Sequence, residues 1–136
     1  MRQTFRKEER LKSSKAIKLL FSRGNSFLIH PFKVNWVPES QEQKFPARVL
    51  IGVSRKNFRK AVERNQVKRV IREAYRKNKY ILYDYLEERE ISCNFSIIFI
   101  GRSKPDHSVA EKKIIDIIKR LISELEYQSD HNKSTS

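Results

Sequence analysis

The apolar positions of this chain follow two periods, one typical of helices and one typical of strands. Apolar residues three and four positions apart predict helices over about 61–78 and from Val109 to about Glu126. The stretch from Tyr80 to Leu86 continues the first of these as helix, with a bend of its own. An earlier helix is predicted between Ser13-Ser14, which can cap its start, and Gly24, which fits the C′ position after its end.

Extended segments separate these helices. Residues 26–38 have strand character, and Pro31 divides them into two short strands or one bent edge strand. Residues 48–54 alternate between two faces, while residues 94–101 are apolar on both faces, which indicates a central strand. The resulting order, α-β-β-β-α-β-α, predicts an α+β fold with a mixed sheet packed by helices.

The length of 136 residues is near the commonest domain size and predicts one compact domain over residues 1–127. The polar residues 128–136 predict a disordered tail. Cys93 is the only cysteine, so the chain cannot form an internal disulfide. The sequence shows no secretory signal and no apolar run near the roughly 18 residues of a membrane span. We therefore expect a soluble, cytoplasmic protein that does not enter a membrane.

The charge balance narrows the choice of partner. The chain has 30 Lys and Arg residues against 16 Asp and Glu, which gives a formal net charge of +14. Such an excess destabilises a compact state by self-repulsion and is typical of proteins with a polyanionic partner. Nucleic acid, an anionic membrane surface and an acidic protein are the candidates.

The cations are concentrated on one side of the predicted helix over 61–78. At about 100° per residue, one arc holds the apolar residues Val67, Val70, Ile71 and Ala74. The opposite arc holds Arg64, Asn65, Lys68, Arg69, Arg72 and Arg76. Like charges at i,i+4 destabilise a helix, so this side is better explained by a bound polyanion than by water. A membrane surface fits less well, because the apolar arc is needed for the core.

Residues 61–73 read AVERNQVKRVIRE and match the pattern A-x-x-R-N-x-[apolar]-K-R-x-x-R-E. This pattern resembles the signature helix of the bacterial ribonuclease P protein subunit. The resemblance extends over most of the chain. A first helix ends in an aromatic residue and Gly24, a strand ending in VSRK precedes the signature, and an apolar strand and a last helix follow it.

The resemblance implies a left-handed βαβ crossover, in a fold like that of the second domain of ribosomal protein S5. Members of this family assist a catalytic RNA, which removes the 5′ leader from precursor tRNA. The expected partners are therefore ribonuclease P RNA and precursor tRNA, with no obligate protein partner. The expected cofactor is Mg²⁺, bound mainly by the RNA, with no catalytic residue and no metal site in this chain.

The resemblance also implies two binding surfaces. The side of the signature helix that faces the catalytic RNA corresponds to Arg64, Asn65, Lys68, Arg69 and Arg72, and Arg76 continues it. A cleft between the sheet and the first helix is expected to hold the single-stranded leader. Its lining is expected to be Phe21, Lys33, Asn35, Arg48, Ser54 and Lys56. Stacking of an unpaired base on Phe21 would contribute about 1–3 kcal/mol without regard to sequence.

Three positions leave alternatives open. Gln66 stands where many relatives carry a further cation. Asn35 stands where the family often has a stacking aromatic residue, and Trp36 would take its place if the strand slipped by one residue. Phe21 can equally belong to the core packing of the first helix.

A nuclease that acts without RNA would need paired carboxylates or a histidine–metal centre. The acids that cluster in the sequence lie at a predicted helix end among basic residues, where they solvate the surface: Asp84, Glu87, Glu88 and Glu90. The histidines show no metal-ligand spacing. The remaining alternative is a non-catalytic basic RNA-binding protein of ribosomal type, which composition alone does not separate from a ribonuclease P subunit.

Overall fold

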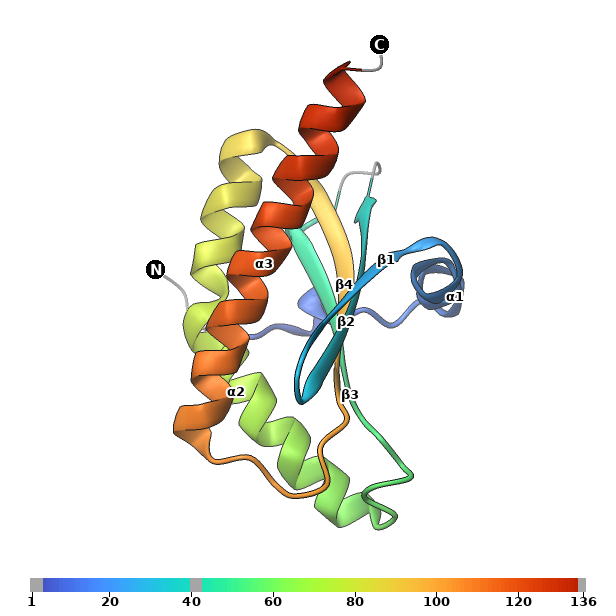
Figure 1. Cartoon of the computed structure of the whole chain (residues 1–136), viewed down its shortest axis with the longest axis vertical. Helices are drawn as coiled ribbons and strands as arrows, with labels where there is room; N and C mark the ends of the chain where they lie inside the picture. The colour runs from blue at the N-terminus through green and yellow to red at the C-terminus, as the bar shows by residue number, and fades with distance from the viewer. Residues whose placement is uncertain (1–3, 40–42, 135–136) are drawn as a thin grey trace.

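The computed structural model describes residues 4–39 and 43–134, without the side chains of residues 130–134. A four-stranded sheet with the order β1-β2-β4-β3 forms its centre (Figure 1). The strands are β1 (Asn25–Ile29), β2 (Phe32–Glu39), β3 (Ala47–Val53) and β4 (Ser92–Phe99). β1 and β4 each pair with β2 in antiparallel fashion, and β3 pairs with β4 in parallel. The sheet is therefore mixed, and the predicted central position of the apolar strand, β4, is confirmed.

Three helices cover the sheet. α2 (Ala61–Arg89) and α3 (His107–Ser134) lie side by side on one face, and the shorter α1 (Ser14–Arg23) lies on the other side (Figure 1). A 3-10 turn, η1 (Lys7–Glu9), precedes α1. The order α-β-β-β-α-β-α and the α+β class agree with the prediction. Among the described helices, none has the length and apolar character needed to cross a bilayer.

The crossover between β3 and β4 is formed by α2. Parallel neighbours cannot be joined by a tight turn and need a long connection, and the 29-residue helix supplies it. Ile71, Tyr75, Leu82 and Leu86 recur at spacings of four and seven and are all 0 % exposed, so one buried stripe runs along the whole helix. This stripe explains why residues 80–86 continue the helix, as predicted.

The first face of the sheet, which lies under α2 and α3, carries the core. The alternation in β2 is as predicted, with Phe32, Val34 and Trp36 buried and Lys33 exposed on the opposite side. Trp36 is 2 % exposed, so it faces the core and the possible slip between Trp36 and Asn35 is ruled out. Each large apolar side chain buried in this way contributes about 1.5–3 kcal/mol. This packing fixes which side of the sheet and of α2 remains available to ligands.

Two helix ends differ from the prediction. Gly24 does follow α1, but its backbone is extended (φ −73°, ψ 158°) and not left-handed. Glycine is needed at this position for another reason: a Cβ there would lie 2.2 Å from the Leu20 carbonyl oxygen and 3.0 Å from that of Trp36.

The end of α3 also differs from the prediction. The sequence predicts an end at about Glu126, but α3 continues to Ser134, so the backbone of residues 128–134, predicted as tail, is helical. Residues 135–136 lie outside the described part, and the domain boundary at residue 127 stays a prediction.

The close approach at Gly24 gives a first test. We expect Gly24→Ala to lower the free energy of unfolding by about 1–3 kcal/mol, because the added methyl group forces the end of α1 away from β2. Ser22→Ala, a change at an exposed position of the same helix, is the control and should have little effect. Urea unfolding followed by circular dichroism measures both variants. Equal stability of the two variants would contradict this account of Gly24.

Candidate nucleic-acid interface

The first four turns of α2 have two chemically different sides. Val67, Val70, Ile71 and Ala74 are between 0 and 5 % exposed, which confirms the predicted apolar arc. Because these residues are fixed against the core, the opposite side of the helix must face outward. Asn65 and Arg69 are exposed there, and Lys68 and Arg72 are half-buried.

The middle of this side lacks compensating acids. In the described part of the chain, no carboxylate lies within 4.0 Å of the cationic groups of Lys68, Arg69 or Arg72. Guanidinium groups present several N–H donors in a fixed plane that matches phosphate oxygens, and lysine adds a compact charge. These three side chains are therefore available to a polyanion.

Arg64 departs from the expectation that the whole predicted face is free. One of its terminal nitrogens, Nη1, donates hydrogen bonds of 2.8 Å to the carbonyl oxygens of both Phe58 and Arg59. This interaction ties the start of α2 to the loop that precedes it. Since a guanidinium has five N–H groups, Arg64 keeps donors for a ligand, but part of its role is structural.

Arg76 departs in another way. Its Nη2 lies 2.6 Å from Oε1 of Glu73, and its Nε donates to Oε2 of the same carboxylate at 3.1 Å. The hydrogen bond from Arg76 lowers the pKa of Glu73, which keeps that carboxylate charged. Glu73 therefore neutralises one of the six predicted RNA-binding positions.

The segment before α1 brings cations that the sequence pattern did not single out. Arg10 forms an isolated parallel bridge with Val49, and the Leu11 N–H donates to the Val49 carbonyl oxygen at 3.0 Å. This pairing along the edge of β3 places Arg10 and Lys12 beside α2. They line a hollow of about 250 Å³ together with Lys68 and Arg72.

A neighbouring hollow continues the same surface along α2. It is lined by Arg10 and Phe5 from the N-terminal segment and by five residues of α2, one of them the acid that pairs with Arg76: Asn65, Arg69, Arg72, Glu73 and Arg76. We call the two hollows together the cationic groove. The groove is defined by Arg10, Lys12, Asn65, Lys68, Arg69, Arg72 and Arg76.

The electrostatics of Arg72 show how close the charges of the groove are. Partial burial lowers the pKa of Arg72, and the charge of Arg10 lowers it further. Arg10 and Arg72 therefore repel each other across the groove, although their side chains come from elements more than 60 residues apart (72 − 10 = 62). Repulsion of this kind is relieved when an anion binds between the two groups.

The second face of the sheet, on the side of α1, holds most of the predicted leader-binding residues. The pairing register shows that Lys33 and Asn35 of β2 and Arg48 of β3 share this face, and Ser54 follows β3 in the same alternation. Arg48 and Ser54 are separated by six residues, or about 20 Å of extended strand. The structure thus brings these positions onto one surface but spreads them along its length.

The exposure of individual residues refines this surface. Phe21 on α1 is 48 % exposed, which excludes the alternative that it belongs to the core, while its neighbour Leu20 is fully buried. Asn35 has the predicted orientation, yet it is only 8 % exposed and offers little area to a ligand. Lys33 and Lys56 are exposed, with Lys56 in the turn after β3.

Carboxylates and thiols do not gather into a recognisable metal site. Within the described residues, no group of three or more His, Cys, Asp or Glu side chains could hold a metal ion. Asp84, Glu87 and Glu88 are exposed on the last turns of α2, and Glu90 follows the helix. Cys93 is fully buried, and burial raises the pKa of its thiol to about 12, so the thiol stays protonated.

Comparison with known proteins agrees with this arrangement. The family model described as Ribonuclease P matches residues 5–125. The chain is 37 % identical over 106 residues to the ribonuclease P protein component of Porphyromonas gingivalis, covering 78 % of this chain and 77 % of the relative. It is 34 % identical over 124 residues to the protein component of Petrotoga mobilis, covering 88 % and 96 %.

A solved structure shows the same fold. The ribonuclease P protein of Thermotoga maritima superposes with a TM-score of 0.66 at 26 % identity, over 82 % of this chain and 96 % of that one. The family match spans both the N-terminal segment and α2, which together form the cationic groove. The chain therefore belongs to the ribonuclease P protein family.

Proposed function

We propose that this chain is the protein subunit of a bacterial ribonuclease P and that it binds the ribonuclease P RNA through the cationic groove. The observation that carries the proposal is a set of groove cations that have no acidic partner among the described residues; they lie on the helix with the family signature and on the N-terminal segment beside it. Lys68, Arg69 and Arg72 supply the contacts from α2, and Arg10 and Lys12 supply them from the N-terminal segment. Contacts of this kind neutralise phosphates and release counterions, which drives RNA association.

The second face of the sheet is proposed to hold the 5′ leader of precursor tRNA. Phe21 supports this assignment because it is an exposed aromatic ring, on which an unpaired base can stack. Lys33 and Arg48 share this face of the sheet, and we propose that they contact the phosphates of a strand that crosses it. The binding needs no particular leader sequence, since stacking accepts any base.

We propose that the RNA subunit, and not this chain, carries out the cleavage. In the proposed holoenzyme, an endoribonuclease acting in the bacterial cytoplasm, the RNA binds the catalytic Mg²⁺. The protein holds the RNA and the leader in place. The groove residues suit this role, because arginine and lysine side chains offer positive charge and N–H donors to phosphate oxygens.

Reconstitution tests the function directly. Purified chain, a bacterial ribonuclease P RNA and precursor tRNA are mixed at low Mg²⁺ concentration, and the cleavage rate is compared with that of the RNA alone. We expect the chain to accelerate cleavage at least about tenfold, equivalent to about 1.4 kcal/mol of barrier. RNA binding without any acceleration would instead support the alternative of a ribosomal-type RNA-binding protein.

Two arginines of α2 are expected to behave differently. Arg69→Ala should weaken RNA binding about tenfold and change the free energy of unfolding by less than about 0.5 kcal/mol, because the side chain is exposed and makes no described contact. Arg64→Ala should weaken RNA binding and, in addition, lower the free energy of unfolding by about 1–3 kcal/mol, because two loop carbonyl oxygens lose their hydrogen-bond donor. Filter binding and urea unfolding measure the two effects. A large loss of stability in Arg69→Ala would show that its side chain is structural.

Phe21 provides the test for the leader surface. Phe21→Ala should weaken holoenzyme binding of precursor tRNA by about 1–3 kcal/mol when the leader is long enough to reach α1. It should leave binding unchanged when the leader is too short to reach. Leu19→Ala, at another exposed apolar position of α1, is the matched control. An equal loss of affinity for precursor tRNA with both leader lengths would show that Phe21 does not contact the leader.

A further inference from the structure

Arg10 lies in the cationic groove although the neighbouring positive charge of Arg72 repels it. The N-terminal segment brings Arg10 next to Arg72, and both groups are positive. Without other interactions, repulsion would move the segment away from α2. The structure must therefore contain contacts that hold the segment in place.

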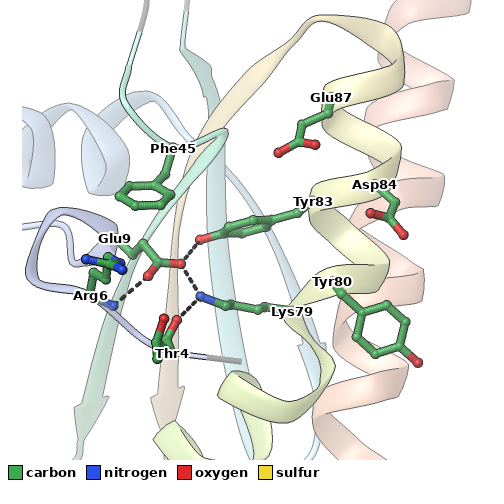
Figure 2. A pocket seen from close by; sticks show the side chains of 9 residues that line it. All are labelled: Thr4, Arg6, Glu9, Phe45, Lys79, Tyr80, Tyr83, Asp84 and Glu87. Atoms are coloured by element: carbon green, nitrogen blue, oxygen red, sulfur yellow. Dashed lines mark hydrogen bonds and ion pairs between the residues drawn. The ribbon is translucent and has the colours of Figure 1, made fainter. Parts of the chain in front are cut away.

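Glu9, the residue before Arg10, makes several of these contacts. Its side chain is 1 % exposed, and its Oε1 accepts hydrogen bonds from the Lys79 ammonium and from the Tyr83 hydroxyl, the latter at 2.5 Å. The other oxygen, Oε2, accepts from the backbone N–H of Arg6 at 2.5 Å. Figure 2 shows the carboxylate between the N-terminal segment and α2, with all three donors directed toward it.

The donors are themselves held in place. The Lys79 side chain is 6 % exposed, and its ammonium also donates to the Thr4 carbonyl oxygen, so it joins two points of the segment (Figure 2). Burial raises the pKa of Tyr83, and Tyr75 and Glu9 raise it further, so the phenol remains a donor. Glu9, Lys79 and Tyr83 thus form a buried network that spans the segment and α2.

The network lies further along α2 than the groove. Lys79 follows Arg72 by seven residues, which is about two turns or 10.5 Å of helix. When Glu9 is fixed at Lys79, the next residue of the segment lies toward Arg72. On the other side of Arg10, Leu11 is 2 % exposed and pairs with Val49, so Arg10 is held from both directions.

We infer that Glu9 and Lys79 are positioning residues for RNA binding: their buried ion pair holds the N-terminal segment on α2 so that Arg10 completes the cationic groove. The inference rests on the proposed function for its ligand, the ribonuclease P RNA. It assigns no RNA contact to Glu9, Lys79 or Tyr83. Their effect on RNA affinity is exerted through Arg10.

A double-mutant cycle between Glu9→Gln and Arg10→Gln tests the inference. Arg10→Gln in the wild-type background should weaken binding of ribonuclease P RNA about tenfold, the effect of one charge-assisted hydrogen bond. In the Glu9→Gln background the same change should cost less than about twofold, because Arg10 no longer sits in the groove. Equal effects in the two backgrounds would overturn the inference, since a purely structural role of Glu9 leaves the two changes independent.

Hydrogen exchange gives a second readout that requires no RNA. We expect the Leu11 amide to exchange at least about tenfold faster in Glu9→Gln than in the wild type, while amides in β4 keep their protection. Unchanged exchange at Leu11 would contradict the inference even if the chain binds RNA. Failure of the wild-type chain to bind ribonuclease P RNA would contradict the proposed function. The hydrogen-exchange test of the N-terminal segment would still be valid in that case.

Three further variants keep the test decisive. Glu126→Gln removes the exposed carboxylate that pairs with Arg89 at 3.3 Å, and as the matched control it should change neither RNA affinity nor Leu11 exchange. Glu9→Gln with Lys79→Met removes both charges, which avoids leaving an unpaired ammonium in the interior. Tyr83→Phe removes only one hydrogen bond to Glu9 and should give the same changes at about two- to threefold size. If Tyr83→Phe alters neither affinity nor exchange, the network does not position the segment.

Discussion

The packing of α2 against the sheet is the constraint on which the rest of the molecule depends. Its apolar stripe, from Val67 to Leu86, is buried along the whole helix and cannot rotate without losing several large side chains from the core. The opposite side is therefore held outward with its cations close together, although like charges at helical spacing repel. Core packing supplies the energy that keeps this charged side ordered before RNA is bound.

The same constraint joins the two proposed surfaces in one rigid unit. α2 connects β3 to β4, and the second face of these strands carries Arg48 and the predicted leader positions. The N-terminal segment runs along the edge of β3, contributes Arg10 to the groove and then leads into α1 with Phe21. Under the proposed function, this arrangement would hold the ribonuclease P RNA and the leader in a fixed relation to each other, which is how the chain would assist cleavage.

Much of the fold and of the apolar side of α2 could be predicted from the sequence, because the burial of these residues depends on local periodicity. The burial of Val67, Val70 and Ile71, and of Trp36 opposite Asn35, follows from the periods of helix and strand. The place of Arg10 could not be predicted, because its partners lie far along the chain and a two-residue bridge leaves no periodic signal. The contacts of Arg64 and the close approach at Gly24 could not be predicted for a related reason, since both involve backbone carbonyl oxygens, which no side-chain pattern reveals.

The salt dependence of binding between the wild-type chain and ribonuclease P RNA tests the central claim most directly. The claim is that Arg10, Lys12, Lys68, Arg69 and Arg72 have no acidic partner in the described part of the chain because RNA phosphates are their partners. If about five cations meet phosphates, the logarithm of the association constant should fall against the logarithm of salt concentration with a slope of about −3 to −5. A slope near zero, with affinity retained at high salt, would show that the RNA is held by other contacts and would contradict this account of the groove.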